Sequence, residues 1–461
     1  MKLRFYLIPA ILLAPSCMLG PDFQLPGVTG GTGWKEGAAA DSTNLPDTWW
    51  RLYGDASLNR LVDRALSANN DLAAAKSRVD TSRALVGIDQ ARLFPTLDLA
   101  GSAGIARASG NVNPNPAAEL ENKNFRGSFN LAFDPDLWGR NKRLIESSTA
   151  DADAMAARYD SLRLGLATEV VRQYFVVRGL DEQRAVLQDT LKSRQEALDI
   201  QKTKTDAGLT DGLATSSART ELELARNDLA NVERQRGAAE HALAVLCGTR
   251  PADFAMTESL GQRPLPDIRP GLPASVLARR PDVRAAEQSL KSANAKIGVA
   301  EANFYPNFSL TGSAGLESLS ASNFLDWESR ILSLGAGAAM PVFEGGANQS
   351  RLAAARSQYE ETLAGYRQTL LIALREVEDS LVDLKGLAKS RAALDAALAS
   401  AKDTRQLTQE RYDEGLTSYL DVVNADRTVL QIRLSIAVVD AQQHISLAAL
   451  AKALGGGWSG K

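Results

Sequence analysis

The sequence predicts an α+β fold built from two tandem structural repeats, and three observations carry this prediction. The phrase LFPTLDLAGSAG at 93–104 returns as FYPNFSLTGSAG at 304–315, and a Gly-Leu-Thr tripeptide occurs at 208–210 and again at 415–417. In both halves, a stretch in which apolar residues alternate with small or polar ones, as in a strand, precedes a long stretch without proline. Units of this length exceed the roughly 20–50 residues of solenoid repeats. The chain is therefore expected to build one supersecondary unit twice.

The N-terminus predicts a secretory signal peptide at 1–16. Two basic residues precede an apolar run from Phe5 to Ala14, and Cys17 follows it. A charged start, a short apolar region and a small-residue cleavage site are typical of secretory signals, and so short a run cannot span a bilayer, which needs about 20 residues. The placement of Cys17 resembles a bacterial lipobox, which implies an acylated cysteine at the start of a linker over 17–57. Ordinary cleavage nearby, with Cys17 free, is the alternative.

Each repeat is expected to open with a helix and two strands, the first repeat over 58–248 and the second over 274–455. Behind the helix, apolar residues alternate with small or polar ones, which is the period of a strand with two unlike faces. Prolines stand at the outer ends of these runs, where a missing N–H is tolerated. The predicted strands are 96–107 and 125–134 in the first repeat, and 307–316 and 331–340 in the second.

Long helical hairpins are expected at about 139–247 and 346–454. Both stretches lack proline, which costs about 3 kcal/mol or more inside a helix, and their leucines recur at coiled-coil spacings. The glycine of each Gly-Leu-Thr tripeptide suits a helix C-cap, so the chain should reverse there. A proline-rich linker at 249–273 joins the repeats, and 456–461 form a C-terminal tail.

The four strands have the dyad pattern of membrane-barrel strands. Four strands cannot close a barrel, because the smallest barrels have about eight, and an open sheet edge cannot lie in lipid. The missing strands must come from other copies of the chain. A cyclic trimer would form a 12-stranded β-barrel, four strands per chain, and would continue it as a long α-helical barrel. The predicted fold class is thus an α+β membrane protein.

Composition argues against an enzyme and against a nucleic-acid-binding protein. The formal net charge is −3 and no run of Lys or Arg occurs, so the basic face that nucleic acid requires is missing. The two histidines, His241 and His444, lie in helical stretches without any HExxH, CxxC, P-loop or GxSxG motif. Cys247 is expected to be a small buried hydrophobe. We expect no catalytic centre, no metal site and no cofactor.

Five phrases, in this order, carry a family resemblance over nearly the whole chain: CMLGPDFQLP from Cys17, WWRLYGDASLNRLVDRAL at 49–66, GLPASVLARRPDVRAAE at 271–287, FYPNFSL at 304–310 and PVFEGG at 341–346. They resemble the TolC-like outer-membrane factors, in the NodT-type branch of efflux lipoproteins. The resemblance implies a lipid-anchored homotrimer in the outer membrane, acting as the passive exit duct through which a tripartite pump exports small molecules.

The partners that the resemblance implies are a periplasmic membrane-fusion adaptor, an inner-membrane pump of the resistance-nodulation-division (RND) type and outer-membrane lipid. Two other functions stay open. One is the outer-membrane channel of an ABC-driven type I secretion system. The other is a structural coiled-coil envelope lipoprotein, although a stalk would not need strands with a polar face.

The resemblance also implies two sets of site residues. A periplasmic gate is expected from Tyr412, Tyr419, Leu420, Asp421, Asn424 and Arg427. Adaptor contacts are expected at the hairpin tips, at Gly208, Leu209, Thr210, Gly415, Leu416 and Thr417. Spacings of three and four place residues 420, 424 and 427 on one helix face. Asn424 replaces the aspartate usual in the family, and Thr417 and Ala214 stand where some members carry a latching arginine and aspartate. An ordinary solvated helix face is the alternative interpretation.

Overall fold

A computed structural model describes residues 18–27, 33–36, 45–111, 121–261, 263–271 and 273–457. The predicted signal peptide and Cys17 lie outside the described residues. The chain forms two compact units. Unit 1 consists of the described parts of Met1–Pro26, Arg78–Ala156 and Ala285–Arg367, and unit 2 of those of Gly27–Ser77, Ala157–Arg284 and Gln368–Lys461. The units cut across the sequence repeats, because each unit takes segments from both.

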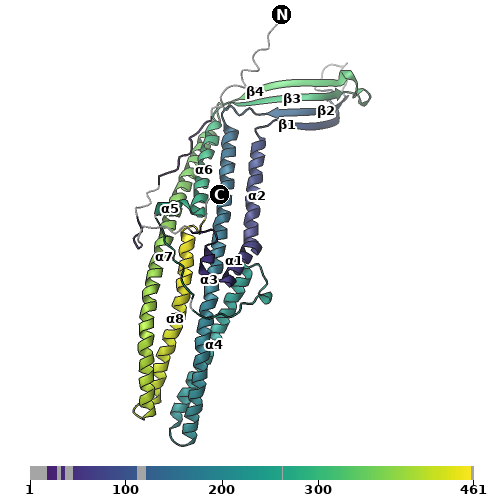
Figure 1. Cartoon of the computed structure of the whole chain (residues 1–461). Helices are drawn as coiled ribbons and strands as arrows, with labels where there is room; N and C mark the ends of the chain where they lie inside the picture. The colour runs from purple at the N-terminus through teal and green to yellow at the C-terminus, as the bar shows by residue number, and fades with distance from the viewer. Residues whose placement is uncertain are drawn as a thin grey trace. The chain divides into compact units, whose positions relative to one another are not determined.

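Unit 1 contains a four-stranded antiparallel sheet in the order β1-β2-β3-β4 (Figure 1). Its strands are β1 (Thr96–Arg107), β2 (Glu121–Phe133), β3 (Asn307–Ser318) and β4 (Arg330–Ala339). The sequence predicted 125–134 for the second strand, which in the structure begins earlier, at Glu121. The β2–β3 pairing joins the two repeats into one sheet, with β1 and β4 at its edges.

The two faces of this sheet differ in chemistry from edge to edge. One row of directly paired residues is apolar and contains Leu99, Phe129, Ala314 and Leu332. The neighbouring row, on the other face, is polar and contains Asp98, Asn130, Ser313 and Ser333. Much of the apolar face is exposed among the described residues, since Leu99 is 73% and Leu332 78% exposed. Such a face needs lipid or another apolar surface.

The ends of the strands pass into helices through an aromatic contact. The Trp138 ring lies 5.0 Å from that of Tyr305, and Trp138 Nε1 donates a hydrogen bond to the Pro306 carbonyl at 2.7 Å. Behind these residues, α3 (Arg140–Asp206) follows β2, and α6 (Pro281–Ala302) precedes β3. The side chains of Ser147 and Ser292 hydrogen-bond at 3.0 Å, which joins the first turns of α3 to α6. Helix α2 (Asn70–Ala91) leads into β1.

Two long helical hairpins lie mostly in unit 2, and the first part of each outgoing helix belongs to unit 1. They are α3 with α4 (Gly212–Leu246) and α7 (Ala347–Asp413) with α8 (Tyr419–Ala453), and in Figure 1 the arms of each lie side by side. The sequence placed these hairpins at about 139–247 and 346–454. By length and composition α8 could cross a membrane, but several residues of its C-terminal half, such as Leu447 and Leu450, are buried inside the protein.

The core of unit 2 gathers around short N-terminal elements, η2 (Trp49–Tyr53) and α1 (Ala56–Ala68). Trp49 and Phe175 are at most 2% exposed and belong to the same cluster. Asp55 caps α1 by accepting the N–H groups of Ser57 and Leu58. The short helix η3 (Pro251–Asp253) lies in the linker between the repeats, and α5 (Pro273–Ala278) begins at the linker's last residue.

Arg280 lies just after α5, and its side chain makes several hydrogen bonds. It is 3% exposed. Its guanidinium donates to both carboxylate oxygens of Asp282 at 3.0 and 2.7 Å, to Glu376 of α7 at 2.7 Å and to the Ala453 carbonyl of α8 at 3.0 Å. One buried cation thus connects the start of α6 with both arms of the second hairpin.

Candidate functional site

The two hairpin tips are built alike. Gly208 and Gly415 adopt left-handed φ values of 71° and 76°, which glycine accepts at little cost. The next residue, Leu209 or Leu416, donates its N–H to a carbonyl of the last helical turn, that of Lys204 at 2.9 Å or Arg411 at 2.8 Å. This pattern is a Schellman C-cap. It leaves Leu209 and Leu416 77% and 63% exposed at the turn.

The return helices also begin alike, but with different caps. Asp211 caps α4 by accepting the N–H of Leu213, whereas α8 has a capping box in which Asp421 accepts the N–H and the hydroxyl of Ser418. Hydrogen bonds from Thr417 and Ser418 hold the pKa of Asp421 below its ordinary value. The predicted gate carboxylate is therefore charged at neutral pH and also stabilises the start of α8.

The first turns of α8 present one exposed face. Leu420 is 58% exposed, and Asn424 and Arg427 are exposed on the same side, whereas Val422 and Val423 are buried. The structure thus places the three residues with gate spacing along one uncovered stripe. Leu420 and Asn424 are exposed to solvent among the described residues, whereas Arg427 reaches Glu221 of α4.

Tyr412 and Tyr419 lie deeper and join the hairpins. Gln201 of α3 donates a hydrogen bond from Nε2 to the Tyr412 hydroxyl at 2.9 Å, and Lys204 Nζ lies 4.7 Å from the centre of the Tyr412 ring. The Tyr412 and Tyr419 rings are 5.7 Å apart. Gln201 is 2% exposed, so this contact is a buried polar link between α3 and α7.

Further along the helices from the turns, a network of charged side chains joins all four helices of the two hairpins. Arg194 of α3 faces Glu221 of α4 at 3.6 Å and Asp426 of α8 at 3.3 Å, and Asp426 also pairs with Arg405 of α7 at 2.6 Å. Arg427 forms an ion pair with Glu221. Arg194 and Glu221 have side chains only 5% and 6% exposed. Separating the hairpins here would strand buried charges, which is costly.

Sequence reasoning identified Arg427 but missed Gln201, Arg194 and Glu221. The only signal for the last two was a charged residue at a position that the hairpin's apolar spacing would place inside. Because most charged residues on long helices face water, that signal is weak. The side that each helix presents to the other hairpin had to be known first.

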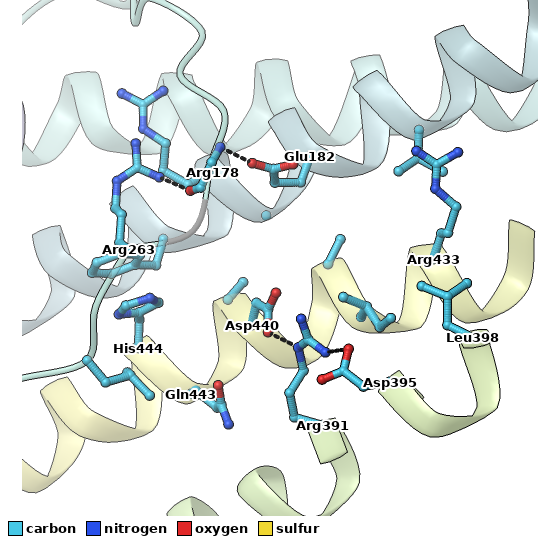
Figure 2. Close-up of a pocket in the computed structure, with 18 residues that line it drawn as sticks. Arg178, Glu182, Arg263, Arg391, Asp395, Leu398, Arg433, Asp440, Gln443 and His444 are labelled. Atoms are coloured by element: carbon cyan, nitrogen blue, oxygen red, sulfur yellow. Dashed lines mark hydrogen bonds and ion pairs between the residues drawn. The ribbon is translucent and has the colours of Figure 1, made fainter. Parts of the chain in front are cut away.

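A cavity of about 590 Å³ lies in unit 2 between α3, α7 and α8 and is also lined by Gly261, Arg263 and Leu265 (Figure 2). Figure 2 shows Arg391 held between Asp395 and Asp440. The other lining arginines also face carboxylates: Arg178 faces Asp181, Arg263 faces Asp55 and Arg433 faces Asp189. The charge of the lining is compensated within the protein, and the lining residues of α8, from Arg433 onward, lie further along that helix than the predicted gate.

His444 lines this cavity as a buried aromatic group. Its ring stacks on Phe175 with centres 4.2 Å apart, and it is 7% exposed. Burial, together with the charge of Arg263, lowers the pKa of His444 from about 6.5 to about 4. The imidazole is therefore neutral in the folded protein at neutral pH.

We predict that His444 makes the fold sensitive to acid. The folded pKa is below the unfolded one, so the unfolded chain binds the extra proton and stability falls as pH drops from about 6.5 to about 4, by roughly 3 kcal/mol in total. His444→Phe keeps a stacking ring but cannot titrate, so this fall should disappear. Thermal unfolding across this pH range measures it. The exposed His241, changed to Phe, is the control, and an unaltered pH profile in His444→Phe would refute the assignment.

Among the described residues, no group of three or more His, Cys, Asp or Glu side chains is placed to hold a metal ion. Cys247 is fully buried, and burial raises the pKa of its thiol, which makes it a poor nucleophile. The notable features of this molecule are its sheet, its hairpin tips and the polar links between the hairpins.

Comparison with known proteins agrees with these features. Residues 61–249 and 272–456 match the family described as "Outer membrane efflux protein". The outer membrane protein OprJ of Pseudomonas aeruginosa is 31% identical over 98% of this chain and 96% of its own length. The toluene efflux pump outer membrane protein TtgI of Pseudomonas putida is also 31% identical, over 100% of this chain and 99% of its own.

Solved structures give the same answer. The outer-membrane channel OprN superposes with a TM-score of 0.90 at 28% identity, covering 96% of this chain and 100% of its own. The CmeC outer membrane channel of Campylobacter jejuni gives 0.92 at 26% identity, over 96% of each chain. The fold is that of TolC-like channels, and the match spans both repeats. The chain belongs to the outer membrane efflux protein family, and it is an outer-membrane channel of an efflux pump.

Proposed function

We propose that the chain forms the exit duct of a tripartite efflux pump as a homotrimer. In this proposal each protomer gives four strands to a 12-stranded barrel, and the hairpins continue it as an α-helical tube. The duct carries small molecules outward passively, without catalysis or a cofactor. A periplasmic membrane-fusion adaptor and an inner-membrane RND-type pump would supply recognition and energy.

The observation that carries this proposal is the four-stranded sheet with two unlike faces and two edge strands. An exposed apolar face with Leu99 and Leu332 suits lipid, and a polar face with Asp98 and Asn130 suits an aqueous lumen. Strands β1 and β4 carry backbone groups that must be paired before the sheet enters a bilayer. Pairing β1 of one protomer with β4 of the next closes the sheet without unpaired edges.

The gate would lie where the exposed stripe of α8 from each protomer meets at the trimer axis. Leu420 would narrow the opening, and Asn424 and Arg427 would place polar and charged groups in it. The links from Tyr412 to Gln201 and from Arg427 to Glu221 support a closed arrangement, since they hold the second hairpin against the first. The exposed leucines of the Gly-Leu-Thr tips would contact the adaptor.

The proposal includes an acyl anchor at Cys17. Met18 follows the cysteine in place of aspartate, which fits transfer to the outer membrane in the usual sorting code. Because the barrel alone holds the protein in the membrane, we expect Cys17→Ser to reduce the yield of assembled trimer more than membrane residence.

The function is tested in cells that lack this chain. Loss of the gene should raise the accumulation of a fluorescent pump substrate such as ethidium, and the wild-type chain should restore its export. If export of ethidium and of organic solvents is unchanged while a secreted protein disappears from the medium, the type I secretion role replaces this one. If neither changes, a structural role remains. Copurification of an adaptor protein with the wild-type trimer would support the assembly.

We predict that Leu99→Arg impairs insertion of the sheet. A charged side chain on the lipid face near the bilayer centre costs about 2–4 kcal/mol, and three copies would carry it in the trimer. Leu310→Arg should act alike, because Leu310 pairs with Phe133 and lies on the same face. Ala100→Arg, on the polar face, is the matched control. The yield of trimer in outer-membrane fractions, measured by native mass, should fall in the first two variants only. Equal yields in all three would argue against a lipid-facing Leu99.

A further inference from the structure

Residues 18–22 belong to unit 1 and form a segment without helix or strand, bent at Gly20, whose backbone is held by side chains. Arg143 of α3 donates from Nε to the Leu19 carbonyl at 2.9 Å and from Nη2 to the Gly20 carbonyl and to Asp22, both at 3.0 Å. Asn294 of α6 donates to the Pro21 carbonyl at 2.8 Å. Three consecutive carbonyls thus each receive a side-chain hydrogen bond.

The guanidinium of Arg143 is buried at its contact with this segment. The side chain is 2% exposed, and its fourth contact is with Glu146 at 2.8 Å. Three of the four acceptors of Arg143 belong to residues 18–22, and among the described residues only Glu146 would remain as its partner without the segment. The contact therefore depends on the segment as much as the segment depends on it.

The fit is close enough to require glycine on both sides. Gly20 has a φ of 88°, and a β-carbon there would come within 2.4 Å of the Gly298 Cα. A β-carbon on Gly298, near the C-terminal end of α6, would come within 2.8 Å of the Leu19 carbonyl oxygen and 2.9 Å of Arg143 Cγ. Gly298 has no conformational reason to be glycine, since helical residues of any type could stand there. Its small size is explained by the docked segment.

The docked segment starts at the end of the sheet. Leu19 donates its N–H to the Trp138 carbonyl at 3.2 Å, and a β-carbon built on Gly139 would lie 2.9 Å from Met18 Cγ. Trp138 lies between the end of β2 and the start of α3 and packs on Tyr305 just before β3. Aromatic residues in this position mark the membrane interface of barrel proteins. Cys17 immediately precedes Met18 in the sequence.

We propose that Arg143, Asn294 and Gly298 form a docking site for the chain's own N-terminal segment, which holds the acylated Cys17 at the periplasmic rim of the barrel. The inference rests on the proposed function, because it needs a lipidated Cys17 and an inserted sheet. It adds a receptor site on the protein itself. The acyl chains then enter the leaflet beside the strands of the same protomer, and the anchor is a fixed part of the rim instead of a free tether.

The test places an aliphatic diazirine amino acid at position 18 of the full chain and maps its photo-crosslinks in detergent-extracted trimer. The wild-type background should give a crosslink to the peptide that carries Gly139. Gly298→Ala should lower its yield about tenfold, equivalent to about 1.4 kcal/mol of docking free energy. Alanine strengthens a helix relative to glycine, so this loss cannot come from a weakened α6. Gly87→Ala in α2, where a β-carbon meets nothing within 4 Å, is the control.

Arg143→Ala gives a second measurement, because it removes the donors and adds no bulk, and it should lower the crosslink as Gly298→Ala does. Retention of the full crosslink in both variants would overturn the docking site. Labelled palmitate should enter the wild-type and both variants but not Cys17→Ser. If the wild-type takes up no palmitate while its crosslink is intact, the anchor part of the proposed function fails, and this inference fails with it. Loss of the crosslink in Gly298→Ala and Arg143→Ala, with normal palmitate uptake in both variants, supports the docking site.

Discussion

Replacing Leu420 by alanine and Arg427 by serine in the same chain will raise the single-channel conductance of the protein severalfold in planar bilayers. Both side chains lie on the exposed stripe at the start of α8. In the proposed trimer three copies of this stripe meet at the axis, so that Leu420 narrows the opening and Arg427 adds a ring of positive charge. The double substitution removes bulk and charge together.

The substitution at Arg427 also has a structural consequence. Arg427 pairs with Glu221, whose side chain is 6% exposed, so serine leaves Glu221 with Arg194 as its remaining partner at 3.6 Å. The second hairpin is then held less firmly against the first, which favours opening as well. Leu420→Ala alone should have a smaller effect, because it widens the opening without loosening the hairpins.

The first hairpin offers matched controls. Leu213 stands at the start of α4 as Leu420 stands near the start of α8, and it is 71% exposed, while Arg226 of α4 pairs with the exposed Glu223. Leu213→Ala with Arg226→Ser should leave the conductance unchanged. Large antibiotics should enter the periplasm only in cells with the α8 variant. If its conductance equals that of the wild-type while the protein remains trimeric and inserted, the constriction lies elsewhere and the stripe is a solvated helix face.

The charge of Asp421 is tested better by Asp421→Asn than by Asp421→Ala. Its carboxylate accepts hydrogen bonds from Ser418 and Thr417 and so stabilises the start of α8. Asp421→Asn removes the charge but keeps an oxygen acceptor for the Ser418 N–H. A reduced cation preference in this variant, at unchanged trimer yield, would place the charge of Asp421 at the channel mouth. Asp421→Ala would mix that effect with loss of the cap.

Much of the fold could be predicted from sequence because its signals are local. Period-2 alternation marks strands, the absence of proline marks the hairpins, and Gly208 and Gly415 mark the turns. The pairing of β2 with β3 is not local, because the segment between them includes a whole hairpin. For that reason the repeats visible in the sequence did not predict the two compact units, which combine segments of both halves.

The site residues divide in the same way. A family resemblance pointed to Leu420, Asn424 and Arg427, and helix spacing placed them on one face. Gln201 and Glu221 could not be found in this way, because most polar residues on long helices face water and the sequence gives at best a weak signal that these two are buried. The docked N-terminal segment was also invisible, because Arg143 and Gly298 are far apart in sequence and ordinary as residue types.

Arg280→Met will destabilise the protein strongly. It removes a guanidinium that is 3% exposed and that binds Asp282, Glu376 and the Ala453 carbonyl. Breaking a buried ion pair costs about 3–5 kcal/mol, and the lower end applies here because the two carboxylates keep 36% and 31% exposure and can be rehydrated. The adjacent Arg279 is exposed, so Arg279→Met should change the thermal unfolding temperature little. Similar losses in both variants would contradict a specific role for Arg280.

The pH dependence of stability distinguishes an ion-pair role of Arg280 from a packing role. Burial alone would raise the pKa of Asp282, but the hydrogen bonds and charge of Arg280 outweigh it and hold the pKa below its ordinary value of 3.8. A carboxyl with a lowered folded pKa stabilises the fold above its unfolded pKa, and that stability is lost as pH falls below about 4. The wild-type should therefore lose stability more steeply in this acid range than Arg280→Met, in which Asp282 has no cation beside it. Only a charged partner can make the difference in stability between the two proteins depend on the protonation of Asp282. Parallel pH profiles would therefore mean that Arg280 acts by packing its alkyl chain.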